Sequence, residues 1–190
     1  MIEVLDRTDL DRLLKTCSRR APSGLRDRAL LALLYGSGLR ISEALTLRTR
    51  DVNLQECTVR VHRGKGGRPR VCGLEAGSAE MVRAWVGVRA GLDVQPGAPL
   101  ICQITVGRIG RAVQPACVRQ MLARRRARAG IEKRVHAHGF RHSHAANMAA
   151  LSLPLNLIQK QLGHANVSTT SRYIDHVRPQ DVIDAVREMG

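Results

Sequence analysis

The chain has 190 residues, of which 31 are lysine or arginine and 16 are aspartate or glutamate, so its formal net charge is +15. A hydrophobic fraction of 44% excludes a disordered basic tail, and no run of about 18 apolar residues is present to span a membrane. The excess of positive charge makes a polyanion the expected partner. The five cysteines are widely spaced and form no CxxC pair, which predicts reduced thiols in a cytoplasmic protein.

The first part of the chain is predicted to be helical. Thr8 with Asp11 three residues later has the spacing of a capping box at the start of an amphipathic helix. A second helix, apolar on nearly every side, is expected over 25–35. The Gly36-Ser37-Gly38 sequence ends it, and a short helix is expected over 41–47.

A β-hairpin is predicted next. Residues 57–63 alternate with period two, Gly64-Lys65-Gly66-Gly67 has turn chemistry, and 68–74 returns as the second strand. Lys65 is therefore expected at or near the tip of this hairpin.

The rest of the chain is predicted to be helices joined by loops. A loop rich in glycine and proline is expected over 91–99, with no internal repeat anywhere. The expected helices cover 78–90, 115–129, 140–151, 154–161, 167–174 and 179–188. The whole chain is thus predicted to be mostly α with a small antiparallel β-hairpin insert.

The basic residues are unevenly distributed. Residues 101–150 hold ten of them against one acid, Glu132, so this segment is the predicted polyanion-binding face. Arginine dominates: only Lys15, Lys65, Lys133 and Lys160 are lysines. A lysine in a glycine-rich hairpin is therefore notable, because an ammonium group can give up a proton and an arginine essentially cannot.

Six residues together point to phosphodiester chemistry. Planar arginine side chains match the nonbridging oxygens of a phosphate, and cationic donors stabilise the charge that builds up there during attack. A tyrosine hydroxyl becomes a nucleophile when a base or a cationic field favours the phenolate. The six residues are Arg40, Lys65, His138, Arg141, His164 and Tyr173.

The motifs around these residues resemble the catalytic domain of the tyrosine recombinases, or phage-type integrases, in order and spacing from about residue 5 to 188. Phe140 stands where the family more often has leucine. The matching segments are Gly38-Leu39-Arg40 with Glu43, the hairpin Lys65, His138-Gly139-Phe140-Arg141-His142, Leu162-Gly163-His164, and Tyr173 nine residues after that histidine. The resemblance implies the DNA breaking-rejoining fold of that catalytic domain.

The resemblance also implies the first set of residue roles. Tyr173 attacks the scissile phosphate, which gives a 3′-phosphotyrosyl link and a free 5′-hydroxyl. Arg40 and Arg141 clamp the nonbridging oxygens, and His164 donates a further hydrogen bond.

The remaining roles concern protons and support. His138 assists proton transfer at the tyrosine, and Lys65 protonates the leaving 5′-oxygen. Glu43 orients Arg40, and His142 supports the site. The covalent link conserves the phosphodiester energy, so the resemblance implies a reaction without metal, ATP or any other cofactor.

Double-stranded DNA is the implied partner. The resemblance implies a homo-oligomer, a tetramer on DNA, with the segment 179–190 docking in cis or onto a neighbour. We expect 1–190 to be a single catalytic domain without the family's separate N-terminal core-binding domain. The predicted DNA-contacting residues are Arg63, Arg68, Arg124, Arg125, Arg126 and Arg128.

Three alternatives remain open at this stage. The first is a type IB topoisomerase-like activity, which uses similar chemistry. The second is a DNA-binding module without catalysis, in which the charge acts only through phosphate contacts. The third is a zinc site built from His136, His138, His142 and His144, although Arg141 lies among them and no cysteine or acid lies nearby.

Overall fold

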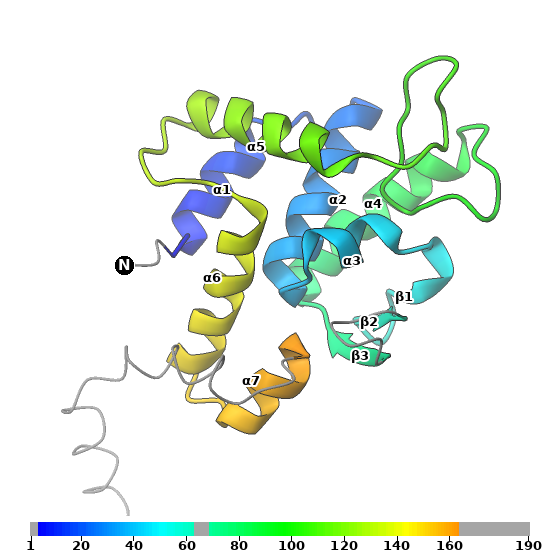
Figure 1. Cartoon of the computed structure of the whole chain (residues 1–190). Helices are drawn as coiled ribbons and strands as arrows, with labels where there is room; N and C mark the ends of the chain where they lie inside the picture. The colour runs from blue at the N-terminus through cyan, green and yellow to red at the C-terminus, as the bar shows by residue number, and fades with distance from the viewer. Residues whose placement is uncertain (1–3, 63–68, 164–190) are drawn as a thin grey trace, which may run out of the picture.

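The computed structural model describes residues 4–62 and 69–163. In these ranges the chain forms helices with one small sheet inserted after the third helix, which confirms the predicted fold class (Figure 1). The elements are α1 (Arg7–Lys15), α2 (Pro22–Ser37), α3 (Ile41–Thr46), the 3₁₀ turn η1 (Thr49–Asp51), β1 (Val52–Asn53), β2 (Thr58–Val61), β3 (Arg70–Gly73), α4 (Ala76–Ala90), α5 (Pro115–Ala129), α6 (Ala137–Ala150) and α7 (Leu155–Leu162).

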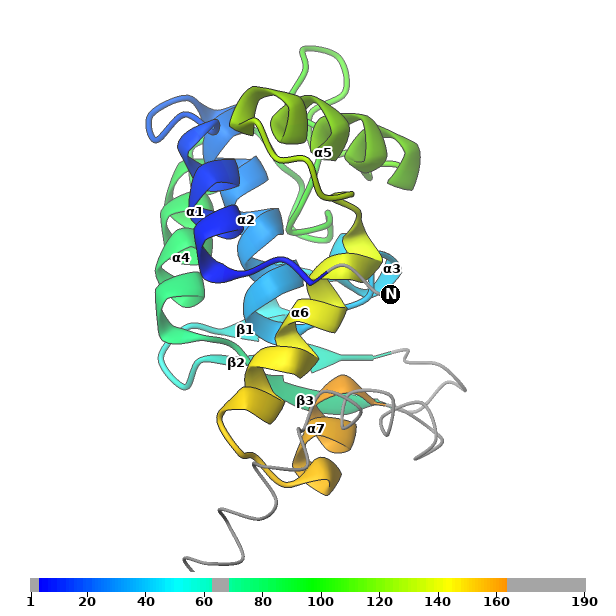
Figure 2. The ribbon, with the colours of Figure 1, turned by 90° about the vertical axis from the view of Figure 1, so that its left-hand side faces the viewer.

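Helix α2 forms the centre of the core. Every residue from 29 to 39 is buried, as expected for a helix that is apolar nearly all round. Helices α4 and α6 both pack against α2, and α1 packs against α5 (Figure 2). The end of α2 therefore lies deep in the protein, and α3 starts from there.

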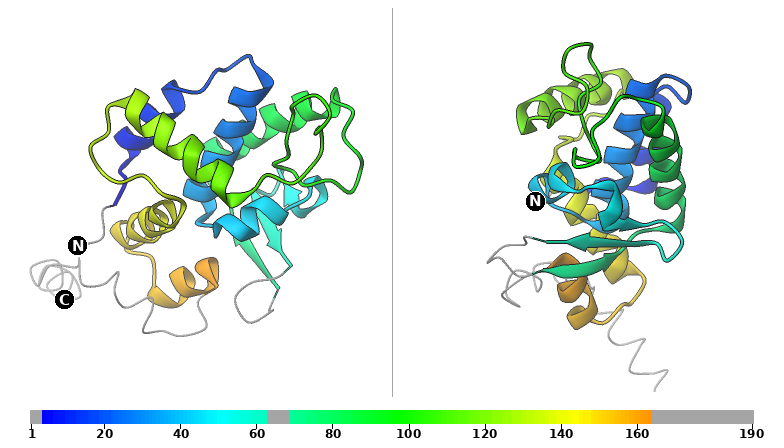
Figure 3. Two further views of the ribbon diagram at one scale, coloured as in Figure 1. Left: turned by 45° about the horizontal axis from the view of Figure 1, so that its top comes forward. Right: turned by 90° about the vertical axis from the view of Figure 1, so that its right-hand side faces the viewer.

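The sheet has the antiparallel order β1-β2-β3. Strands β2 and β3 form the predicted hairpin, with Val59 opposite Cys72. The additional strand β1 is only two residues long, too short for an alternating pattern to predict it. Helix α7 packs against β3 (Figure 3). The predicted hairpin tip with Lys65, and the helices predicted over 167–174 and 179–188, lie outside the described residues.

Two helix starts differ from the sequence expectation, and both differences come from capping. Helix α1 begins at Arg7, two residues earlier than a cap at Thr8 would allow, because Asp6 caps it and forms a capping box with Asp9. Helix α6 begins at Ala137 instead of 140, because the side chain of His136 accepts a hydrogen bond from the backbone of Gly139. The extra turn brings His138 into α6.

Helices α2 and α4 approach each other closely at Gly36. A Cβ atom there would lie 2.2 Å from Ser78 Oγ, and Ser78 is fully buried. The backbone oxygen of Gly36 also accepts a hydrogen bond of 3.0 Å from Glu75 N, so the contact includes the main chain. The glycine is needed here for space, not for an unusual backbone conformation.

A buried carboxylate joins α3 to the sheet. Both oxygens of Glu43 accept hydrogen bonds of 2.9 Å from the guanidinium of Arg70 on β3. The side chain of Glu43 is 2% exposed and that of Arg70 is 11% exposed. Burial would raise the pKa of Glu43, but hydrogen bonds from Arg70 and Arg40 outweigh this effect and lower its pKa to about 2.

We expect Gly36→Ala to destabilise the protein by about 1–3 kcal/mol, because the added methyl group overpacks the contact with Ser78. Gly87→Ala on α4 is the matched control, since a Cβ at Gly87 meets nothing within 4 Å. That change should stabilise the helix by up to about 1 kcal/mol. Urea unfolding of both variants makes the comparison, and equal effects would show that α2 and α4 have room at this contact.

We also expect Glu43 to make stability pH-dependent in acid. Its folded-state pKa is about 2 against an ordinary value of 4.5, so the unfolded chain takes up the proton first. The stability from this group is complete above pH 4.5 and is lost as the pH falls toward 2. Glu43→Gln should lower stability at neutral pH by about 3–5 kcal/mol and should flatten this acid dependence.

Glu80→Gln serves as the control for that change, because the Glu80 side chain is 70% exposed beside Arg83. Unfolding midpoints measured between pH 2 and 7 should separate the two variants. An unchanged acid limb in Glu43→Gln would contradict the role given to the buried carboxylate.

Candidate active site

A cavity of about 230 Å³ lies where α3 and α6 begin. Two of its lining side chains are arginines and one is a histidine, and the lining residues that the structure describes include no carboxylate. Such a lining suits a small anion with several oxygen acceptors. The lining residues are Leu39, Arg40, Ile41, Ser42, Ala137, His138 and Arg141.

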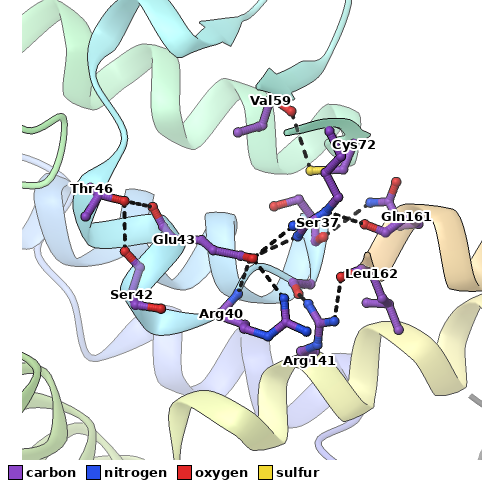
Figure 4. A network of polar contacts seen from close by, with 12 residues as sticks. Ser37, Arg40, Ser42, Glu43, Thr46, Val59, Cys72, Arg141, Gln161 and Leu162 are labelled. Carbon is purple, nitrogen blue, oxygen red and sulfur yellow. Dashed lines mark hydrogen bonds and ion pairs between the residues drawn. The ribbon is translucent and has the colours of Figure 1, made fainter. Parts of the chain in front are cut away.

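Arg40 reaches this cavity from the start of α3. Gly38 ends α2 in the left-handed conformation, with φ of 63°, and so turns the chain toward α3. The backbone nitrogen and the guanidinium of Arg40 each donate to Glu43, at 2.9 Å (Figure 4). Arg70 binds the same carboxylate, so the group that positions Arg40 is itself fixed. The side chain of Arg40 nevertheless stays 25% exposed.

Arg141 enters the cavity from α6 and is 1% exposed. Its Nη1 donates to Gly38 O at 2.8 Å, and its Nη2 donates to Leu162 O at 2.5 Å (Figure 4). A buried charge is costly unless it is hydrogen-bonded, and here the backbone supplies the acceptors. Arg141 thereby connects the end of α2 to the end of α7, where Gly163 terminates the helix.

Two histidines on α6 stand beside the arginines. The rings of His138 and His142 meet edge to face, with centroids 4.2 Å apart. Burial, and then the charges of Arg141, His136 and Arg40, lower the pKa of His138 below its usual range. Burial and the neighbouring rings lower the pKa of His142 to about 4. Both rings are therefore neutral at neutral pH, and a neutral imidazole can accept a proton.

The other two histidines of the zinc alternative have different tasks. His136 caps α6, and Nδ1 of His144 lies 2.8 Å from the backbone oxygen of Tyr35. Across residues 4–62 and 69–163, no group of three or more His, Cys, Asp or Glu side chains is arranged to hold a metal ion. The four histidines therefore do not form the ligand cluster that the alternative required.

The structure thus brings together five of the residues that the sequence singled out. They are Arg40, Glu43, His138, Arg141 and His142. The other predicted catalytic residues, Lys65, His164 and Tyr173, and the predicted DNA contacts Arg63 and Arg68, lie outside the described residues.

The arginine run on α5 divides into two groups. Arg124 and Arg128 are exposed. Arg125 is 14% exposed and forms an ion pair of 2.9 Å with buried Asp27. It also donates to the backbone oxygen of Thr16. The guanidinium of Arg125 thus holds α5 against α1 and α2, and these contacts argue against its predicted role in binding DNA.

Arg126 also makes contacts within the protein. Its guanidinium donates to the backbone oxygens of Lys133 and Glu132, at 2.8 and 2.6 Å, in the turn after α5. This part of the predicted DNA-binding set therefore stabilises the turn that leads into α6.

Two further residues at the site were not predicted. Arg70 holds Glu43, and Gln161 connects α7 to β3 through Gly73. Arg70 lies in an alternating strand of a chain rich in arginine, so nothing local distinguishes it. Gln161 stands next to the Leu162-Gly163-His164 segment, which was the only sequence signal for it.

The comparisons with known proteins agree with this geometry. Tyrosine recombinase XerC from Xanthomonas campestris pv. campestris is 37% identical over 171 residues, which is 90% of this chain and 50% of that protein. The chain thus spans about half the length of this relative.

Solved structures show the same fold. The crystal structure of XerA recombinase superposes with a TM-score of 0.80 at 25% identity, covering 100% of this chain and 65% of that one. XerH site-specific recombinase bound to its difH substrate, in a post-cleavage complex, gives 0.77 at 27% identity, covering 97% of this chain and 52% of that one.

Among the helices that the structure describes, none combines the length and the apolar character that a membrane-spanning segment requires.

The model of the family described as "Phage integrase family" matches residues 3–179 of this chain. This match over most of the chain, together with the relatives above, shows that the chain belongs to the phage integrase family of tyrosine recombinases and has the fold of their catalytic domain.

Proposed function

We propose that this chain breaks and rejoins DNA at specific sites through a covalent 3′-phosphotyrosyl intermediate, without metal or ATP. The observation that carries the proposal is the cavity lined by Arg40 and Arg141, with both guanidinium groups fixed by hydrogen bonds. Donors that are fixed before the reaction need no rearrangement when charge develops on the phosphate, so they favour the transition state.

Each step of cleavage then has a group to perform it. The Tyr173 oxygen forms a bond to phosphorus, and the bond from phosphorus to the 5′-oxygen breaks. His138, neutral because of its surroundings, accepts the tyrosine proton. Lys65 gives a proton to the leaving oxygen, and His164 donates to the phosphate. Rejoining is the reverse reaction with a new 5′-hydroxyl.

The double-stranded DNA substrate is held by exposed positive charge. Arg124 and Arg128 are exposed on α5, which supports phosphate contacts by these two side chains, and Arg63 and Arg68 belong to the same proposed set. The proposal also includes assembly into a homo-tetramer on DNA, in which the segment 179–190 docks on a neighbouring copy. It further includes a cytoplasmic location. The XerH complex with a DNA substrate supports the choice of DNA.

Tyr173→Phe should abolish covalent attachment to DNA, because the variant lacks the attacking oxygen. The test incubates the protein with a pool of nicked duplexes in the presence of a metal chelator and separates the products on a denaturing gel. Tyr35→Phe is the matched control: the chain has only two tyrosines, and Tyr35 is 3% exposed with its hydroxyl accepting from Asn147.

We expect an adduct from the wild type and from Tyr35→Phe, and none from Tyr173→Phe. DNA binding without an adduct in all three proteins would favour the binding module. Relaxation of supercoiled DNA through Tyr173, without strand exchange between two sites, would favour the topoisomerase.

Replacing Arg124 and Arg128 with alanine should weaken DNA binding and reduce its dependence on salt. Each lost phosphate contact lowers the slope of log K against log salt by about 0.9. Arg125→Ala on the same helix should reduce thermal stability and leave this slope unchanged, because Arg125 pairs with Asp27. Filter-binding titrations at several salt concentrations compare the wild type with the two variants, and an equal slope in all three proteins would count against α5 as the contact surface.

A further inference from the structure

The end of α7 is attached by a small apolar contact and several polar ones. Ile158 and Leu162 are buried against Ala145 of α6 in a cluster separate from the main core. At the last turn, Arg141 donates to Leu162 O at 2.5 Å and Arg70 donates to Gln161 O at 3.3 Å. Since the apolar contact is small, the polar contacts determine where this turn lies.

The side chain of Gln161 pairs with the sheet as a neighbouring strand would. Its Oε1 accepts from Gly73 N at 2.8 Å, and its Nε2 donates to Gly73 O at 2.9 Å. The same Nε2 lies 3.2 Å from Ser37 O at the end of α2. Because Gly73 presents both a donor and an acceptor, the amide satisfies both in only one orientation.

His144 completes this arrangement from α6. Its Nδ1 lies 2.8 Å from the backbone oxygen of Tyr35, which can only accept, so the ring proton is on Nδ1. Nε2 of the neutral ring therefore carries a lone pair, and it lies 3.2 Å from Nε2 of Gln161. The ring therefore accepts from the amide. Because Nε2 of Gln161 has two hydrogens and faces three acceptors, its hydrogens are shared among Gly73 O, Ser37 O and His144 Nε2.

Burial keeps the ring of His144 neutral. Burial lowers the pKa of His144 and nearby Arg141 lowers it further, while the hydrogen bond to Tyr35 O and the charge of Glu75 oppose them, with a net lowering. A proton on Nε2 would face the N–H groups of Gln161, whose amide cannot turn over without losing Gly73.

We propose that His144 and Gln161 are positioning residues for cleavage: together they hold the last turn of α7 against β3 and the end of α2. These contacts thereby fix the backbone oxygen of Leu162, which accepts from Arg141, and the adjacent Gly163. This pair, which we call the α7 latch, acts through other residues and does not itself touch DNA. The inference rests on the proposed function.

Gln161→Met tests the latch, because it keeps the volume of the side chain and removes its donors and acceptor. Asn156→Leu is the matched control, an equally apolar replacement of an exposed amide on the same helix. We expect the single-turnover rate of adduct formation on saturating nicked DNA to fall about ten- to a hundredfold in Gln161→Met, with DNA affinity unchanged. Asn156→Leu should match the wild type in both.

Gln161→Glu separates positioning from general stability. A carboxylate still accepts from Gly73 N, but it can pair with His144 only when Nε2 is protonated. The rate of adduct formation by Gln161→Glu, relative to the wild type, should therefore rise as the pH falls from 8 to 6. This rise should vanish in the double variant that also carries His144→Phe. A ratio that does not change with pH would overturn the proposal.

Hydrogen exchange of the α7 amides keeps the two proposals distinguishable. Gln161→Met should exchange faster than the wild type at Leu162 and Gly163, whereas Asn156→Leu should not. If the wild type forms no adduct, the proposed function fails and exchange still decides whether the latch exists. If the wild type forms the adduct and Gln161→Met equals Asn156→Leu in rate and exchange, the latch is refuted and the proposed function stands.

Discussion

The arrangement of the site depends on the buried carboxylate of Glu43. A charge that is 2% exposed is tolerated only when its oxygens are fully used, and both accept from Arg70 while Arg40 donates to them as well. The same group therefore performs two tasks. It fastens α3 to β3, and it fixes the arginine that opens into the cavity.

Arg141, the second arginine of the cavity, is likewise held by hydrogen bonds within the protein. It belongs to α6, yet its two terminal nitrogens donate to backbone oxygens at the ends of α2 and α7. Its position is thus set by three helices, of which α2 lies about 100 residues before the other two in the sequence. An arginine held in this way cannot turn toward solvent, so the cavity keeps its cationic lining before any DNA arrives.

The sequence predicted what local chemistry determines. The bounds of α5 were predicted correctly, because Pro115 opens the helix and Gly130 closes it. The sequence could not predict that Arg124 is exposed while Arg125 pairs with a buried carboxylate, since adjacent residues on a helix face different ways. Only the position of α5 in the folded protein shows which of the two meets Asp27 of α2.

The parts of the site that were missed depend on contacts between distant segments. Arg70 and Glu43 are 27 residues apart, and Gln161 and Gly73 are 88 apart. No local pattern marks such pairs. The short strand β1 and the cap at Asp6 were missed for a different reason: each involves so few residues that a competing local reading, such as Thr8, was equally available.

The central claim is that Arg40 and Arg141 hold the scissile phosphate in a cavity formed before DNA binds. A crystal structure of the Tyr173→Phe variant with an intact duplex tests it most directly, because the DNA cannot be cleaved. The account predicts one phosphodiester inside the cavity, with its nonbridging oxygens within hydrogen-bond distance of both guanidinium groups and Glu43 still bound to Arg70. DNA held only along α5, with the cavity empty of phosphate, would contradict it.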